Sequence, residues 1–317
     1  MRCRVFIAVV LAVLPAVSHA GDENDPADLR LRIAPNETLK YVWTINSASE
    51  SRGQEKGKSF TLTSDSASGM TLIMKGMPMK HDPQPLSIRF QNFSWREKRA
   101  IGESVVDATV SRGHMKCIEN GKLTVDSDND VGLDRIKEYE QHIKRMEEGE
   151  IRTTLDAAGL PGEIQGDTAM AETLKNGGAH GIFPILAGKE LKSGESWEDS
   201  FNISEMGEFK LARPAVVRAK MTFSKWETKD GKRLARIDLT SAWDSQELRG
   251  ENPDGMLAKI INVDCHGTGT CLFDPATGHY VDGSVTYSSR YRIEGESNGQ
   301  SAGLDVTGKS KFTFMAQ

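Results

Sequence analysis

A two-residue alternation of apolar and polar side chains dominates the second half of this chain. In residues 217–224, Val217 and Phe223 share one parity, whereas arginine, lysine, threonine and serine fill the other. The stretches 234–243 and 279–295 repeat the pattern. Successive side chains of a strand point to opposite faces, so this rhythm predicts strands with one buried and one solvated face.

Several of these stretches exceed the usual strand length of about five or six residues. Long strands with one wet side are typical of antiparallel sheets, and their length favours a large bent sheet over a compact sandwich. The sequence therefore predicts a mainly β fold with a minor α component. We expect a long antiparallel curved sheet or an open barrel.

The hydrophobic period changes to three and four residues near the middle of the chain. The apolar residues with this spacing are Leu133, Ile136, Tyr139, Ile143 and Met146. The pattern predicts a central amphipathic helix packed on the apolar face of the sheet. Asp128 or Asp130 is expected to cap its first turn, and Gly149 to end it.

Three smaller features accompany these elements. Residues 151–156 and 162–166 are expected to form a hairpin around a glycine-proline turn, and a second helix is expected from Thr168 to Lys175. Gly267 and Gly269 share the apolar parity of one strand and are expected to leave a shallow groove or permit a bend. That groove admits a ligand or makes room for the central helix, and we favour the helix.

Short motifs repeat between the two halves. Asn36-Glu37-Thr38-Leu39 aligns with Gly194-Glu195-Ser196-Trp197, which predicts an internal duplication with a meander of strands in each half. Chance agreement between two amphipathic meanders is the alternative. The expected division is a signal peptide at 1–20, an N-terminal β meander at 21–130, central helices and hairpin at 131–186, and a C-terminal β meander at 187–317.

The first twenty residues, MRCRVFIAVVLAVLPAVSHA, have the basic start, apolar run and small residues of a secretory signal. We expect cleavage after Ala20, a soluble mature chain with no membrane span, and a location in the periplasm or outside the cell. Loss of Arg2 and Arg4 changes the formal net charge from -5 to -7. An evenly mixed acidic surface argues against nucleic acid as a partner.

Three cysteines follow the signal segment: Cys117, Cys265 and Cys271. An odd number leaves at least one thiol without a disulfide partner, so the pattern is no disulfide framework. Cys265 and Cys271 would lie roughly 20 Å apart on one strand, too far for a bridge. A bridge from Cys117 to either of them remains open.

Two stretches carry side chains suited to metal ions. The candidate ligands are Asp126, Asp128 and Asp130 in an acidic turn and Met77, Met79 and His81 in a proline-flanked loop. The aspartates have the alternate spacing of a calcium loop, although the next glycine and glutamate each come one position late. The methionines and histidine suit Cu(I). The alternative for the aspartates is a turn that caps the helix, and the alternative for the methionines is packing in the core.

No phosphate-binding loop, dinucleotide fingerprint or nucleophile elbow is present, so no catalytic residue and no cofactor is expected. We expect a noncatalytic binding or carrier-like protein of the bacterial envelope, possible partners being an apolar small molecule or another envelope protein. The candidate cavity-lining residues are Trp43, Phe201, Met221, Phe223, Trp243, Tyr287 and Tyr291, for which core packing is the alternative role.

Two other function classes stay open. A structural or interaction protein of the envelope would have a filled core, whereas a carrier would enclose an apolar volume of several hundred Å³, on the order of known ligand pockets. A hydrolase would need a histidine beside a carboxylate or nucleophile in a cleft. The histidines after the signal segment are His81, His114, His142, His180, His266 and His279.

Several stretches resemble an uncharacterised family of exported bacterial β-rich proteins, described only as a domain of unknown function. The resembling residues are Thr154-Leu155-Asp156 with Gly159, Gly162, Glu163 and Ile164, Gly194-Glu195-Ser196-Trp197, and Phe273-Asp274 with Thr277-Gly278. They extend from about the middle of the chain to near its end. The resemblance implies an envelope-associated β-rich protein and transfers no catalytic residue.

Overall fold

The computed structural model describes residues 24–55, 58–78, 83–166, 171, 174, 184–206, 209–244, 247–252, 257–297 and 300–317. Its main strands are β2 (Thr38–Glu55), β3 (Lys58–Gly76), β4 (Gln84–Ile101), β5 (Ser104–Ser111), β6 (His114–Glu119), β7 (Lys122–Asp126), β8 (Ile151–Leu155), β10 (Ser196–Met206), β11 (Phe209–Lys229), β12 (Lys232–Trp243), β13 (Glu247–Glu251), β14 (Leu257–Asp274), β15 (His279–Ser297) and β16 (Gln300–Ala316). A small sheet pairs β1 (Ala27–Asp28) with β9 (Glu190–Leu191), and the helix α1 covers Leu133–Glu147.

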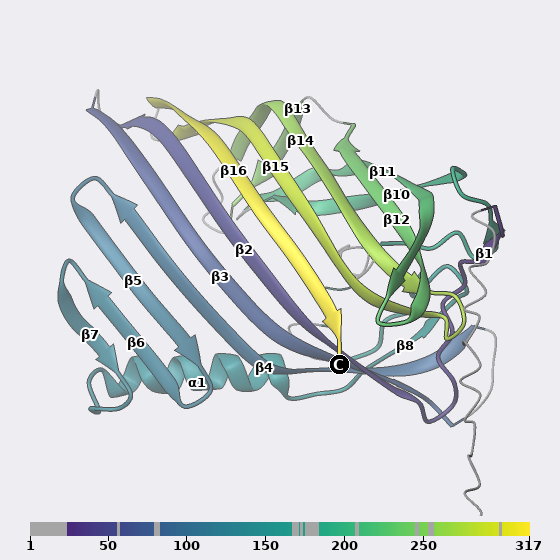
Figure 1. Cartoon of the computed structure of the whole chain (residues 1–317). Coiled ribbons are helices and arrows are strands. Elements are labelled where there is room, and N and C mark those ends of the chain that lie inside the picture. Colours follow the sequence, from purple (N-terminus) through teal and green to yellow (C-terminus); the bar gives the residue numbers. More distant parts are fainter. Residues whose placement is uncertain are drawn as a thin grey trace, which may run out of the picture.

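One large antiparallel sheet contains the main strands, in the order β10-β11-β12-β14-β15-β16-β2-β3-β4-β5-β6-β7 (Figure 1). Strand β13 pairs with β11 and β14, and β8 pairs with β4. The expectation of a mainly β protein with a large curved antiparallel sheet and a minor helical part is confirmed. The pairing of β16 with β2 joins the two halves of the chain into this one sheet.

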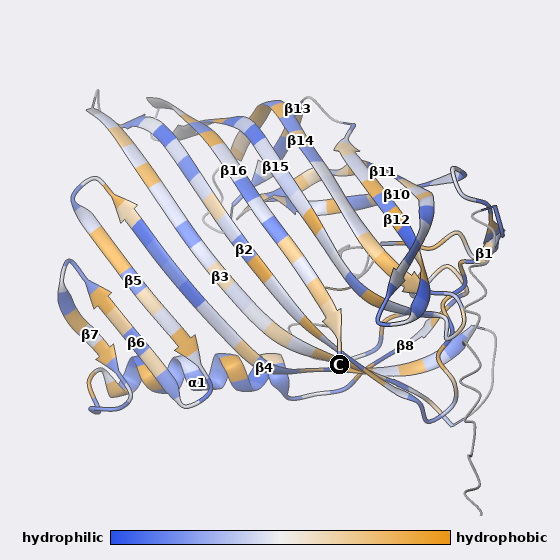
Figure 2. Cartoon of the chain, in the orientation of Figure 1, coloured by the Kyte–Doolittle hydropathy of each residue, from blue (hydrophilic) through white to orange (hydrophobic). Residues whose placement is uncertain are grey.

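The two faces of the sheet differ, and Figure 2 shows the alternation of hydrophobic and hydrophilic residues along the long strands. We call the face that carries Trp43, Met221 and Phe223 the inner face, because these side chains are buried. The opposite face, the outer face, carries polar residues such as Thr307 and Lys309, which are exposed. The one-sided strands predicted from the sequence are therefore present.

The buried residues form three clusters on the inner face. The main cluster includes Tyr41, Trp43, Leu72, Met221, Phe223, Ile237 and Phe314. The second lies under α1 and includes Val110, Met115, Cys117, Val125, Ile136 and Ile143. The third includes Leu211, Leu248, Ile260, Val263 and Cys265, with Trp243 and Tyr291 packed against it.

An extended segment before β2 crosses the main core at one end of the sheet. Its alternate residues Ala27, Leu29, Leu31 and Ile33 are buried. The backbone N–H of Leu31 donates to the carbonyl of Ala157 at 2.8 Å. The segment thus closes that end of the core and orders the loop after β8.

The helix α1 confirms the central amphipathic helix but covers only one part of the sheet. It packs against β4 and β7 (Figure 1), where Ile136 and Ile143 are buried. Leu133 is 51% exposed, so its expected burial is wrong. The expectation that α1 fills the space beside Gly267 is also wrong, because α1 contacts β4 and β7 instead. The Ser241 hydroxyl and the Tyr287 ring lie beside Gly267.

The ends of α1 differ partly from the expectation. Gly132 takes the N-cap position with φ 73°, and no side chain caps the first turn, so neither Asp128 nor Asp130 has the expected role. Left-handed backbone at this position suits glycine, which has no Cβ. Glu148 forms the C-cap in extended conformation, and the predicted stop at Gly149 follows directly.

The hairpin after α1 is present, with short pairing in its second arm. Strand β8 supplies the first arm, and single bridges join Arg152 to Gln165 and Leu155 to Pro161. Of the second predicted helix, Thr168 to Lys175, only Ala171 and Leu174 belong to the described residues. Both are helical and buried. The remaining positions of that prediction lie outside the described residues.

The turns that lead into β2 and β10 have the same hydrogen bonds. The N–H of Glu37 donates to the carbonyl of Ala34 at 3.0 Å, and Glu37 Oε2 accepts from the N–H of Ala34 at 2.7 Å. Glu195 and Lys192 repeat both bonds at 3.0 and 2.7 Å. The aligned motifs thus form equal turns, while the predicted duplication of whole meanders stays a prediction.

Candidate functional site

The seven aromatic and methionine residues singled out from the sequence all lie on the inner face, but in three different surroundings: the main cluster, the third cluster and a cavity. Trp43 is 6% exposed and Phe223 fully buried within the main cluster, so both pack the core. Trp243 and Tyr291 pack against the third cluster. Phe201, Met221 and Tyr287 line one common cavity.

This cavity, which we call the aromatic cavity, has a volume of about 40 Å³. Its walls are Pro184, Ile185, Asp199, Phe201, Ala219, Met221, Leu239, Ser241, Val285, Tyr287 and Phe312. Phe201 comes from β10 and Phe312 from β16, although four strands separate these two in the sheet. The curvature of the sheet therefore brings inner-face side chains from distant strands to one place.

The register of the strands explains how the walls combine. Phe201 pairs with Val217, and Asp199 with Ala219, so both side chains of β10 share the inner face of its neighbour β11. Ala219 and Gly267 lie on either side of Ser241, and their small size leaves space there. The cavity therefore owes its shape to the small residues Ala219 and Gly267 on the middle strands and to the large rings of Phe201 and Phe312 on β10 and β16.

The polar groups of the aromatic cavity lie on one side of it. They are the Asp199 carboxylate, whose Oδ2 is buried, the Ser241 hydroxyl and the Tyr287 phenol. Burial raises the pKa of the Tyr287 phenol, so this group stays neutral and able to donate a hydrogen bond at neutral pH. Tyr287 is nevertheless 40% exposed, which makes it the wall that meets solvent.

A second apolar cavity, of about 30 Å³, lies between Leu31, Ile88, Leu160 and Tyr280. Both cavities are far smaller than the several hundred Å³ expected of an enclosed carrier pocket. Leu31 of the N-terminal segment and Leu160 after β8 line the second of them. Neither of these two cavities, among the described residues, has the enclosed volume that the sequence predicts for a carrier.

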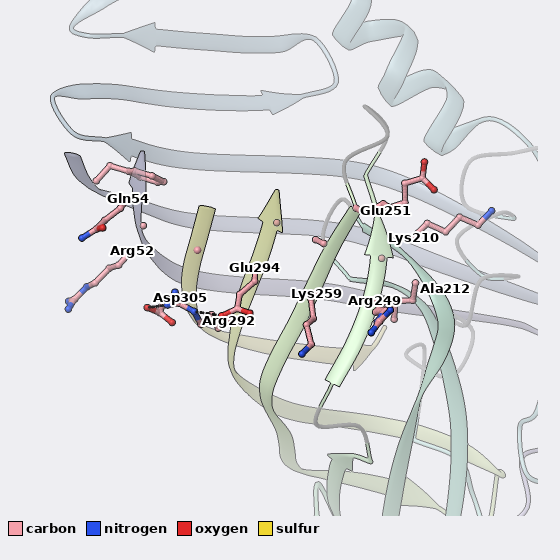
Figure 3. A pocket seen from close by; sticks show the side chains of 18 of the residues that line it. Arg52, Gln54, Lys210, Ala212, Arg249, Glu251, Lys259, Arg292, Glu294 and Asp305 are labelled. Carbon is pink, nitrogen blue, oxygen red and sulfur yellow. Dashed lines mark hydrogen bonds and ion pairs between the residues drawn. The ribbon is translucent and has the colours of Figure 1, made fainter. Parts of the chain in front are cut away.

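A much larger depression than these two cavities is a charged groove of about 1500 Å³ at the ends of β2, β3, β11, β13, β14, β15 and β16. Figure 3 shows its charged side chains along a band of strand ends. Arg52, Asp305 and Arg292 are successive partners across β2, β16 and β15. Arg292 donates to Asp305 at 2.9 Å and to Glu294 at 3.1 Å. Neighbouring side chains of opposite charge thus pair with one another within this groove.

The acidic turn proposed for calcium uses its first carboxylate internally. Asp126 is 7% exposed and accepts from the N–H of Asp128 at 2.9 Å and from Asn129 Nδ2 at 3.0 Å. The Asn129 hydrogen bond is the largest cause that lowers the pKa of Asp126. Asp130 has φ 54° and Asp128 is exposed. The turn resembles a side-chain-capped bend, and calcium binding stays a prediction.

Of the proposed copper ligands, Met79 and His81 lie outside the described residues. Met77 is half-buried, and its N–H donates to the carbonyl of Pro85 at 2.9 Å. Within the ranges that the structure describes, no three His, Cys, Asp or Glu side chains gather as a metal site requires. Copper binding also stays a prediction, which equilibrium dialysis with Cu(I) tests.

Three histidines approach a carboxylate, each in a different part of the sheet. His114 lies 3.3 Å from Asp128, His266 lies 3.4 Å from Asp264, and His279 lies 3.4 Å from Glu37. The first two pairs are exposed. The cavities described above contain none of these histidines among their described walls. His81 and His180 lie outside the described residues.

The cysteines are free and distributed over the three clusters, so the bridge from Cys117 that the sequence left open is absent. Cys117 lies under α1, Cys271 in the main cluster and Cys265 in the third. Burial raises the pKa of Cys265 to about 11, and burial likewise raises that of Cys271. These thiols act as small apolar side chains.

Sequence reasoning missed Phe312 and Asp199 as walls of the aromatic cavity. Phe312 lies on the last long strand, whose pairing with β2 gave no local signal. Asp199 carried a signal, because it has the same parity as Trp197 and Phe201 and so places a carboxylate on an apolar face. A charged residue on an apolar strand face is costly to bury, so its presence there indicates a candidate functional residue.

Comparisons with known proteins add little at the level of sequence: no protein-family model and no curated protein matches the chain. In the described part of the chain, no helix has the length and apolar character required to cross a bilayer.

Among solved structures, the chain is similar to one of lipid-protein interactions in lipovitellin, with a TM-score of 0.46 and 13% identity, over 90% of this chain and 25% of that chain. OccK7 (OpdD) from Pseudomonas aeruginosa gives a TM-score of 0.19 at 6% identity over 88% of this chain and 99% of that chain. The translocator domain of the autotransporter NalP from Neisseria meningitidis gives 0.17 at 5% identity, covering 86% and 88%. The chain thus spans a quarter of the lipovitellin chain.

Proposed function

We propose that this protein is a noncatalytic binding protein, carrier-like, that holds an apolar or amphipathic small molecule on the inner face of its sheet. The aromatic cavity carries the proposal. Phe201, Tyr287 and Phe312 keep part of their surface accessible there, whereas the neighbouring apolar residues Met221 and Val285 are buried. Exposed aromatic surface at a cavity is a frequent mark of ligand contact.

The shape of the site favours partial rather than complete enclosure of the ligand. A volume of about 40 Å³ has room for roughly three water-sized groups. Tyr287, 40% exposed, opens the cavity to the outside. One end of a molecule therefore enters the aromatic cavity, and the remainder extends past Tyr287 to the outside.

The first experiment identifies what accompanies the purified protein. The protein is expressed with its natural N-terminus, purified without detergent and extracted for mass spectrometry of small molecules. A stoichiometric apolar or amphipathic compound is the expected result. The variant Ala219→Leu, which fills the cavity from β11, should lose this compound. Ala242→Leu, on the exposed outer face of β12, should keep it.

A structural or interaction protein of the envelope is the second candidate, and the small volumes of the two apolar cavities favour it. It predicts that purified protein is free of ligand and that Ala219→Leu changes stability alone. A clean extract, together with absent binding of octyl-chain amphiphiles in calorimetry, would decide for this candidate.

We also propose export through the signal segment at residues 1–20 and residence in the periplasm or outside the cell, as expected for the family that the chain resembles. Three buried free thiols are compatible with either compartment, because burial protects them from oxidation. Intact mass of the protein recovered from a periplasmic extract tests this directly. A mass beginning at Gly21 supports export, and a mass beginning at Met1 in the cytoplasm contradicts it.

A further inference from the structure

The walls of the aromatic cavity combine aromatic rings with one carboxylate. Three aromatic rings, from Phe201, Tyr287 and Phe312, reach it from β10, β15 and β16. One carboxylate, from Asp199, belongs to the same wall as Phe201, two residues away on β10. No other residue among the described walls is charged.

This combination has a defined chemical preference. The faces of aromatic rings carry negative potential and attract cations within roughly 6 Å, most strongly where water is excluded. The Asp199 carboxylate, whose Oδ2 is buried, adds an acidic group on one side that attracts a cation. Anions are disfavoured by the same groups, because none of the described walls is basic. The Ser241 hydroxyl adds an acceptor for an N–H donor.

The size of the space agrees with a small cation rather than a long chain. About 40 Å³ admits roughly three water-sized groups, which suits an ammonium or methylated ammonium group. An alkyl chain of eight carbons is too large to enter completely. Its remainder extends from the cavity along Phe312 and Tyr287, whose rings keep exposed surface.

We propose that the aromatic cavity binds an ammonium group, so that the ligand is an amphiphile with a positively charged amine at one end and an apolar chain at the other. This inference rests on the proposed function and specifies its ligand class. Asp199 supplies the charge, and Phe201, Tyr287 and Phe312 supply the ring faces. The aliphatic walls Met221, Leu239 and Val285 exclude water from the site.

The test is isothermal titration calorimetry of the delipidated full chain at pH 7 with three ligands of equal chain length: n-octylamine, n-octanol and octanoate. Asp199→Asn removes the charge while keeping the shape. Tyr287→Leu removes a ring face while keeping apolar contact. The matched control is Glu198→Gln, since Glu198 is the adjacent residue on β10 and is exposed on the outer face.

The expected result is that octylamine binds at least tenfold more tightly than octanol or octanoate. Asp199→Asn should reduce octylamine affinity at least tenfold and leave octanol affinity unchanged, Tyr287→Leu should weaken octylamine severalfold, and Glu198→Gln should change neither. Equal affinity for octylamine and octanol would overturn the ammonium proposal while leaving the binding function in place. Binding of none of the three would overturn both.

Discussion

The hydroxyl of Ser47 on β2 lies 2.8 Å from the hydroxyl of Ser310 on β16, although 263 residues separate the two along the chain. On the outer face the hydroxyls of Thr44 and Thr313 lie 2.5 Å apart in the same strand pair. The contact between β2 and β16 therefore has side-chain hydrogen bonds on both faces in addition to its backbone ladder. This strand pair fastens the halves of the protein together.

Truncation of Phe314 should test how much this strand pair contributes. Phe314 is 2% exposed and pairs with Trp43, whereas its neighbour Met315 is 60% exposed on the outer face. Phe314→Ala should lower the free energy of unfolding by about 3–5 kcal/mol through lost burial and a cavity. Met315→Ala should change it by less than about 0.5 kcal/mol. Urea unfolding followed by circular dichroism measures both, and equal effects would contradict the assigned faces.

The attachment of α1 gives a second matched pair. Ile143 is 3% exposed in the cluster under the helix, and Leu133 is 51% exposed. Ile143→Ala should destabilise the protein by about 2–5 kcal/mol, because it leaves a cavity among packed apolar side chains. Leu133→Ala should stay within about 0.5 kcal/mol of the parent protein. A larger effect at Leu133 than at Ile143 would show that α1 packs through a different face.

The equal turns before β2 and β10 predict interchangeable residues. Asn36 has φ 64° and Gly194 has φ 88°, the left-handed region that asparagine and glycine tolerate. Gly194→Ala should cost about 1–2 kcal/mol in unfolding free energy from backbone strain alone, since no atom lies within 4 Å of the added Cβ. Asn36→Gly and Gly194→Asn should both be tolerated. Thermal unfolding of the three variants decides, and a stable Gly194→Ala would refute this conformation.

Stability at alkaline pH should depend on Cys265. Burial, with a smaller contribution from Asp264, raises its pKa from 9.0 to about 11, so the folded state disfavours the thiolate. The resulting stabilisation is complete below pH 9 and is lost as the pH rises towards 11. Denaturant unfolding at pH 9 and at pH 11 should therefore show a larger loss for the parent protein than for Cys265→Ala. Equal losses would mean that the thiol is solvated.

Local patterns predicted the elements of this fold well where a strand or helix has one apolar side. Val217, Met221 and Phe223 are buried as their parity required, and Ile136 and Ile143 are buried as their helical spacing required. The position of α1 could not be derived, because amphipathic spacing identifies the apolar side of a helix but not its partner strands. Leu133 illustrates the boundary effect, since the first turn extends beyond the cluster below it.

The candidate site was predictable only in part for a related reason. The parity of Phe201, Met221 and Tyr287 placed them on the inner face, but their meeting in one cavity depends on the curvature of the whole sheet. Phe312 joins them only because β16 pairs with β2 and β15. The extended segment from Ala27 to Ile33, whose alternate residues pack in the main cluster, is too short for its alternation to stand out.

The pairing of β2 with β16 also means that β2 has to wait for its partner strand during synthesis of the chain. Thr307 donates to Glu50 across 257 residues, and a ribosome that adds about 5–20 residues per second needs roughly 10 to 50 seconds to make that length. Throughout this interval one edge of β2 offers its N–H and C=O groups to any other strand in reach. The newly made first half must therefore be shielded, by a chaperone or by its own loose collapse, until its last partner emerges.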